Sequence, residues 1–127
     1  MTTRKLLTGA LGAMLLFGAG MLVGANKFGQ PKSVLHVVTV RWKADSTEAQ
    51  RQAAIQGVAK MAGEIPGIKN VWLKTLKVQG ENYNAAFVIE FQDEKAFQAY
   101  ATAPAHKTWE DVYVPIRDRS TTHDITN

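Results

Sequence analysis

The segment Val34–Trp42 constrains the fold more than any other part of this chain. Its sequence, VLHVVTVRW, carries branched or apolar side chains at both odd and even positions. Because successive side chains of a strand point to opposite faces, such a strand is typical of a sheet that is covered on both sides. The 127-residue chain offers helices for only one of those faces. We therefore expect a second copy of the chain to cover the other face, in a homodimer.

A helix is expected directly after this strand. Asp45 and Glu48 fit a cap and N3 pair at its start, and Pro66 followed by Gly67 stops it. Apolar residues between these points recur at spacings of three and four, as in a helix with one buried side. They are Ile55, Val58, Ala62 and Ile65.

Three further strands and a second helical region complete the pattern. Residues 68–78 and 85–91 predict strands joined by a turn, and residues 120–127 predict a short, polar last strand. Between them, residues 93–114 predict a helix that is interrupted at Pro104 and carries apolar residues on its inner side: Ala96, Phe97, Tyr100, Trp109, Val112 and Val114. The order β-α-β-β-α-β is that of ferredoxin-like α+β folds.

The start of the chain differs in composition from the rest. Two basic residues precede residues 6–25, twenty residues without a charge. A basic start, an apolar run and an exit of small residues are the three parts of a secretory signal, and Val23 and Ala25 fit a cleavage point. We expect residues 1–25 to be a signal peptide, residues 26–33 a linker and residues 34–125 the folded domain, which would be periplasmic or secreted.

An uncleaved membrane anchor is the alternative for the same segment. At about 1.5 Å per helical residue, residues 6–25 are long enough to span a bilayer, and Gly20–Gly24 has the GxxxG spacing of helix dimers. The domain would still lie outside the cytoplasm, because basic residues stay inside. In either case we expect membrane contact only through this segment.

Charge and cysteine content exclude several classes of protein. The chain has no cysteine, which excludes disulfides, thiolate metal sites and a cysteine nucleophile. A formal net charge of +4 is too small to indicate a nucleic-acid partner. The three histidines lie too far apart for a metal signature. We expect no metal and no cofactor.

His106 and Tyr100 are the best candidates for chemistry. We expect His106 on a loop after Pro104, where a side chain can face a cavity. Imidazole takes up and releases protons near neutral pH, and a neutral phenol stabilises an enolate oxygen. His36 shares a strand face with two valines, so we expect these three polar side chains around one small cavity, with apolar walls from Val38, Val40, Phe87, Ile89 and Trp109. The alternative is structural: His106 ties its loop to backbone carbonyls and Tyr100 is a core aromatic residue.

Four stretches together resemble the stress-responsive A/B barrel (Dabb) family. They are His36–Lys43, Glu64–Lys69, Phe91–Glu94 and Tyr100–His106. The resemblance extends from about residue 34 to residue 125. It implies a dimeric α+β barrel, in which two sheets pack face to face, and a link to stress response.

The resemblance also carries expectations about the site. In a plant polyketide cyclase of this family, a histidine and a tyrosine around an HPAH-type motif serve as the acid–base pair. Those positions fall on His106 and Tyr100, and a cavity histidine falls on His36. Two further histidines of the pattern are replaced, by Ala85 and Ala103. The aromatic residues that line the cyclase pocket from the first helix fall on the smaller Ala54, Ile55 and Val58. We expect Ile55 and Val58 to line the cavity of this protein.

Two functional classes follow from these patterns. The first is an exported, homodimeric stress-response module of the cell envelope that binds a small ligand or a partner. It is favoured because it needs fewer retained residues. The second is a small-molecule enzyme, polyketide-cyclase-like or lyase-like, with His106 and Tyr100 as its acid–base pair.

Overall fold

The computed structural model describes residues 28–80 and 82–127. Residues 31–127 form one compact unit. The predicted signal peptide or anchor, residues 1–25, lies outside the described residues. Within the described residues, no helix is both long and apolar enough for a membrane span.

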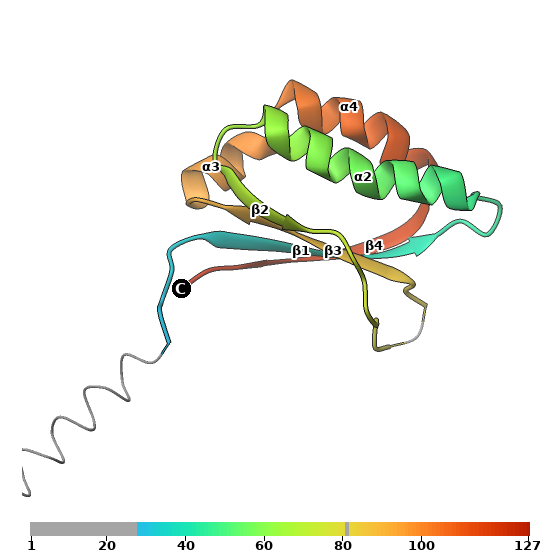
Figure 1. Ribbon diagram of the computed structural model, residues 1–127, viewed down its shortest axis with the longest axis horizontal. Coiled ribbons are helices and arrows are strands. Elements are labelled where there is room, and N and C mark those ends of the chain that lie inside the picture. Colours follow the sequence, from blue (N-terminus) through green and yellow to red (C-terminus); the bar gives the residue numbers. More distant parts are fainter. Residues whose placement is uncertain (1–27, 81) are drawn as a thin grey trace, which may run out of the picture. The chain divides into compact units, whose positions relative to one another are not determined.

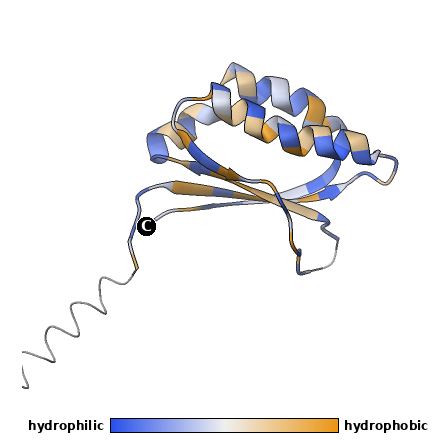
Figure 2. Ribbon diagram, in the orientation of Figure 1, coloured by the Kyte–Doolittle hydropathy of each residue, from blue (hydrophilic) through white to orange (hydrophobic). Residues whose placement is uncertain are grey.

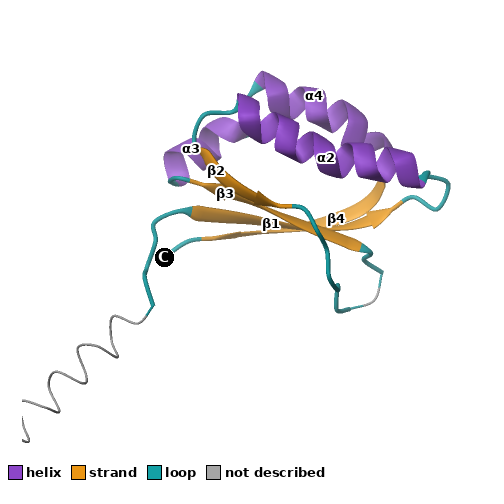
Figure 3. Ribbon diagram, viewed as in Figure 1, coloured by secondary structure: helices purple, strands orange, loops and turns teal. Residues whose placement is uncertain are grey.

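Four strands form one antiparallel sheet, and the helices all lie over one of its faces (Figure 1). The strand order is β2-β3-β1-β4. The strands are β1 (Val34–Trp42), β2 (Ile68–Trp72), β3 (Ala85–Phe91) and β4 (Arg117–Ile125). The helices are α2 (Glu48–Glu64), α3 (Glu94–Tyr100), α4 (Pro104–Tyr113) and the 3₁₀ turn η1 (Val114–Ile116). Figure 3 shows the resulting two layers, which confirm the predicted ferredoxin-like α+β fold.

The core lies between the sheet and the helices. Alternate residues of β1 and β3 point into it, and the largest side chains among them are fully buried. From the helices, α2 and α4 contribute aliphatic and aromatic residues to the same cluster. Its central members are Val38, Val40, Phe87, Ile89, Phe91, Val58, Met61, Tyr100, Trp109 and Tyr113.

The second face of the sheet carries no helix. We call it the open face, and its larger apolar residues are Leu35, Val37, Trp72, Val88 and Ile125. They are neighbours across the strands, because Val88 pairs with both Val37 and Trp72, and Leu35 pairs with Ile125. Trp72 and Ile125 are 51% and 54% exposed. Figure 2 shows β1 hydrophobic over most of its length and β4 mainly hydrophilic.

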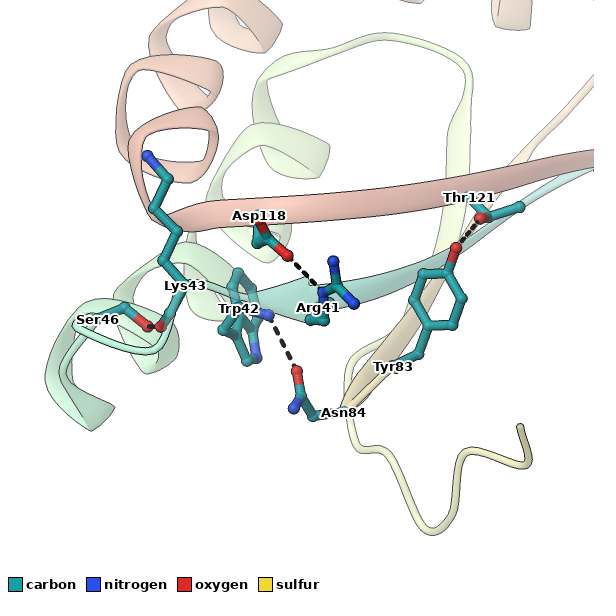
Figure 4. Close-up of polar contacts among 8 residues, drawn as sticks. All are labelled: Arg41, Trp42, Lys43, Ser46, Tyr83, Asn84, Asp118 and Thr121. Atoms are coloured by element: carbon teal, nitrogen blue, oxygen red, sulfur yellow. Dashed lines mark hydrogen bonds and ion pairs between the residues drawn. The ribbon is translucent and has the colours of Figure 1, made fainter. Parts of the chain in front are cut away.

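Polar contacts border the open face near the end of β1 (Figure 4). Arg41 forms an ion pair with Asp118 of β4. The Tyr83 hydroxyl shares a hydrogen bond with the Thr121 hydroxyl, and the Asn84 side chain accepts one from the Trp42 backbone N–H. The Tyr83 and Asn84 contacts tie the loop before β3 to β4 and β1, and the ion pair joins these two strands to each other.

Helix α2 starts two residues later than the sequence pattern predicts. Its N-cap is Thr47, whose hydroxyl accepts from the Gln50 backbone N–H, while the Gln50 side chain accepts from the Thr47 N–H. This reciprocal capping box satisfies two helix-end donors at once, so it prevails over Asp45. Of the predicted apolar stripe, Val58 and Ile65 are buried, whereas Ile55 and Ala62 are only partly buried. Ala54 and Met61 are buried in their place.

The ends of two strands also differ from the prediction. Strand β2 stops at Trp72 instead of residue 78. The Thr75 hydroxyl accepts a hydrogen bond from the Ala86 backbone N–H and donates one to the Ala86 carbonyl oxygen, so these groups are not available to a longer β2. Strand β4 begins at Arg117 and is therefore longer than predicted at its start. In α4, the predicted Trp109 is buried together with Tyr113, whereas Val112 in α4 and Val114 in η1 are 47% and 41% exposed.

Candidate active site

The corner between α3 and α4 determines where His106 lies. Sequence reasoning placed His106 on a loop, but Pro104 is the first residue of α4, so His106 occupies the first helical turn. A proline fits that position because its missing N–H has no helical partner and its φ is already helical. The corner turns the chain back, and the rings of Tyr100 and His106 meet with centroids 4.1 Å apart.

These two rings lie in the wall of a cavity of about 330 Å³. Strands β1, β3 and β4 form its floor, and α3 and α4 form its roof. The aliphatic and aromatic part of its wall consists of Val38, Phe87, Phe97, Tyr100, Ala101, Trp109 and Tyr113. The remaining wall is polar: His36, Gln98, His106, Glu110, Arg117, Ser120 and Thr122.

Two contacts orient the His106 ring. Its Nδ1 lies 3.3 Å from the Ala101 carbonyl oxygen, which can only accept, so the proton of the neutral ring is assigned to Nδ1. Nε2 then carries the lone pair, and the Glu110 carboxylate lies 3.8 Å from it. Glu110 stabilises the ring when Nε2 takes up a proton. The His106 side chain is 13% exposed.

Tyr100 is held in its neutral form. Burial raises the pKa of its phenol well above the ordinary value, and the negative charges of Glu110 and Asp124 raise the pKa further. Its ring packs edge-on against Phe91, with centroids 5.0 Å apart. The phenol is therefore a hydrogen-bond donor at any pH at which the protein is expected to work.

His36 completes the polar group. It pairs with Asp124 across β1 and β4, and its Nδ1 lies 2.6 Å from an Asp124 carboxylate oxygen. A carboxylate accepts from Nδ1, which fixes the ring orientation and leaves Nε2 as the other polar atom. The His36 ring centroid is 5.6 Å from that of Tyr100. The structure thus brings His36, Tyr100 and His106 around one cavity.

Trp109 forms a rigid part of the wall. Its indole N–H donates to the Ala54 carbonyl oxygen at 2.8 Å, which fastens α4 to α2. Its ring stacks on Tyr113, with centroids 4.4 Å apart, and meets Phe87 edge-on. A side chain at Gly57 would meet the indole at 2.9 Å, so the close approach of the two helices requires glycine there.

Four residues that were predicted to line the cavity lie outside it. Val40, Val58 and Ile89 are fully buried in the core, where larger neighbours cover them. Ile55 faces a separate hollow of about 470 Å³ between α2 and the segment after β2. Ala54 and Met61 are buried in place of Ile55 and Ala62, and Ile55 contributes to this other hollow instead of the His–Tyr cavity.

Four further polar residues at or beside the cavity were not identified from the sequence: Glu110, Tyr113, Arg117 and Asp124. Glu110 and Tyr113 follow His106 by four and seven residues, which places all three on one side of a helix. This spacing predicts a shared helix side only if Pro104 is taken as the first residue of a helix. Asp124 and Arg117 depend on the register of β4 against β1, which the sequence does not display. No cluster of three or more metal-ligating side chains occurs in residues 28–80 and 82–127.

The fold and the site define a small ferredoxin-like α+β protein with a His–Tyr cavity between sheet and helices. Residues 34–127 match the family model described as the stress responsive A/B barrel domain, and the chain belongs to this family. The resemblance inferred from the sequence is thereby confirmed.

Relatives of the chain include enzymes and dimeric proteins. It is 29% identical over 97 residues to olivetolic acid cyclase from Cannabis sativa, covering 74% of this chain and 96% of the cyclase. A dimeric ferredoxin-like protein from Thermobifida fusca has a TM-score of 0.66 at 24% identity, over 80% of this chain and 96% of that one. A hydroxynitrile lyase from Passiflora edulis has a TM-score of 0.68 at 16% identity, over 75% and 93%.

Proposed function

We propose that this protein binds a small carbonyl compound in the His–Tyr cavity and catalyses proton transfer at the carbon next to the carbonyl. The observation that carries the proposal is the ring contact of Tyr100 and His106 at 4.1 Å, in the wall of a cavity of about 330 Å³. The cyclase relative supports it, because its name describes a reaction on a small molecule. The cavity has the size of a small-ligand site.

The chemistry follows from the protonation of the two side chains. The Tyr100 phenol donates a hydrogen bond to the carbonyl oxygen of the ligand, and this bond strengthens as the oxygen becomes an enolate. The His106 Nε2 lone pair takes the proton from the adjacent carbon. Glu110 stabilises the imidazolium that results. Return of the proton to carbon, or attack of the enolate carbon on a second carbonyl, completes the reaction.

The remaining residues support this pair. Asp124 orients His36 beside Tyr100, so that its Nε2 provides a second polar contact for the ligand. Phe87, Phe97 and Trp109 exclude water from one side of the cavity. Exclusion of water strengthens each hydrogen bond to the developing charge.

The test uses heptan-2-one as a probe in deuterium oxide. Wild-type protein should exchange the protons next to its carbonyl for deuterium faster than buffer does, as followed by proton NMR. His106→Ala should lower the exchange rate by about 10²–10⁴-fold, the usual contribution of a general base. Tyr100→Phe should lower it as well, while the fold, checked by circular dichroism, is retained.

A matched control is Lys107→Ala, which changes an exposed neighbour of His106 on the same helix. It should leave the exchange rate unchanged. If wild-type protein binds heptan-2-one but never accelerates exchange, proton transfer is excluded and the protein is a binding module only.

We propose in addition that the protein is a homodimer. The open face presents a row of apolar side chains that a monomer would leave in water, and structural relatives are described as dimeric. Protein lacking residues 1–25 should sediment at about twice its monomer mass at micromolar concentration. A stable monomer at that concentration would remove this part of the proposal.

Export to the cell envelope completes the proposal. It rests on the basic start and the uncharged run of residues 6–25. Intact-mass analysis of the envelope fraction should find a mature chain that begins at Asn26. Recovery of the full-length chain only after detergent extraction would favour the membrane anchor instead.

A further inference from the structure

We infer that the ligand carries a carboxylate in addition to its carbonyl group, and that Arg117 and the Tyr113 hydroxyl bind this carboxylate. This inference rests on the proposed function and specifies its substrate class. It concerns the end of the cavity opposite His106, which the proton-transfer chemistry does not use.

A buried hydroxyl marks this end. The Tyr113 hydroxyl is fully buried; burial raises the pKa of its phenol, and the nearby Ser120 and Arg117 side chains act to lower it. No hydrogen bond of normal geometry joins the hydroxyl to either of them among the described residues. Tyr113 itself is 3% exposed and lines the cavity. An unsatisfied buried donor costs stability. A ligand oxygen in the cavity would satisfy it.

A guanidinium lies beside this hydroxyl. The Arg117 guanidinium carbon is 5.2 Å from the Tyr113 ring centroid, and its Nη1 donates to the Ser120 hydroxyl at 3.3 Å. Among the described residues, no carboxylate forms an ion pair with Arg117. A guanidinium has five N–H donors, so several remain for a carboxylate, which it binds in a two-pronged manner.

The charges in the wall give the ligand one orientation. The acidic side chains near the cavity, Glu110 and Asp124, lie at the end that holds His106 and His36. Along α4, His106 and Tyr113 are seven residues apart, which is about 10 Å at 1.5 Å per residue. A carboxylate is therefore repelled from the histidine end and attracted to Arg117. Its carbonyl is left at Tyr100, several bonds away.

The pair 6-oxoheptanoate and heptan-2-one tests this inference. They share one carbon chain and one carbonyl position, and differ in a terminal carboxylate or methyl group. By calorimetric titration, wild-type protein should bind the oxo acid about ten- to a hundredfold more tightly, the effect of a hydrogen bond to a charged group. Arg117→Gln should abolish this preference by lowering the affinity for the oxo acid.

Tyr113→Phe is the second variant. It removes the unpartnered hydroxyl, so the ligand-free protein should have an unchanged or higher melting temperature, while the affinity for the oxo acid falls. If the hydroxyl has only a structural role, Tyr113→Phe should lower the melting temperature and leave the affinity for the oxo acid unchanged. Arg119→Gln is the matched control, since Arg119 is an exposed arginine two residues along β4 that does not line the cavity.

The possible outcomes separate this inference from the proposed function. Equal affinity of wild-type protein for the two probes, or an unchanged preference in Arg117→Gln, overturns the carboxylate site. An Arg117-dependent preference without deuterium exchange of heptan-2-one supports the carboxylate site and overturns only the proton transfer. His106→Ala should keep the preference for the oxo acid, because His106 lies at the other end of the cavity.

Discussion

Phe87 and Val88 are neighbours in β3, yet they belong to two different environments. Phe87 is 2% exposed and packs against Trp109 and Tyr113 under the helices. Val88 points to the open face, where its strand neighbours are Val37 and Trp72. Both faces carry apolar side chains, but helices cover only one of them. The comparison teaches that apolar side chains alone do not mark the core, since the position of the helices decides which face is the core of the protomer.

The largest effect is expected on the covered face. Phe87→Ala should lower the free energy of unfolding by about 3–5 kcal/mol, because the lost contacts leave a cavity that the sheet and helices cannot close. Denaturant titration of both proteins at equal concentration measures the difference. A loss below about 1 kcal/mol would show that the helices repack easily over the sheet.

The next effect concerns the open face. Val88→Asp should weaken self-association by about a hundredfold or more, because the interface would bury an unpaired carboxylate. Sedimentation over a range of concentrations should then find monomers with native circular dichroism. Val114→Asp is the control, since Val114 is exposed and lies outside the sheet. Native dimers of Val88→Asp would place the interface on another surface.

A smaller effect is expected where the covered face meets its helices. Trp109→Phe keeps an aromatic ring but removes the N–H that donates to the Ala54 carbonyl oxygen. The Ala54 carbonyl keeps its hydrogen bond within α2, but the bond between the helices and part of the ring packing are lost. The free energy of unfolding should therefore fall by about 1–3 kcal/mol. An unchanged stability would mean that the indole N–H does not contribute to the attachment of α4 to α2.

The smallest effect is the response of the covered face to alkaline pH. Burial raises the pKa values of Tyr100 and Tyr113 above their ordinary value of 10.0. As pH rises above this value, the unfolded chain releases these protons first, which favours unfolding. Stability should therefore be unaffected by these groups below about pH 10 and should fall above it.

Thermal unfolding of wild-type protein and Tyr100→Phe between about pH 8 and 11 measures this response, since it spans the ordinary range of tyrosine ionisation. The variant should lose less stability than wild-type protein over this interval. Parallel curves would contradict a raised pKa of Tyr100.

Much of the fold was predictable because its signals are local. The run of branched and apolar residues predicted both ends of β1 correctly, and Pro66-Gly67 correctly indicated where α2 ends. Errors arose where one local interaction replaced another of similar strength. Thr47 capped α2 in place of Asp45, and the Thr75 hydroxyl ended β2 early. The same kind of error placed His106 on a loop.

The sequence by itself determined the element order, the two-faced apolar character of β1 and the presence of His36, Tyr100 and His106. Periodicity and turn residues depend on near neighbours in the chain, so they can be read directly. Only the tertiary structure decided that Asp124 lies against His36, and that Arg117 and the unpartnered Tyr113 hydroxyl share one end of the cavity. These placements depend on the register of β4 against β1 and on how α4 lies over the sheet, and both are set by packing among segments far apart in sequence.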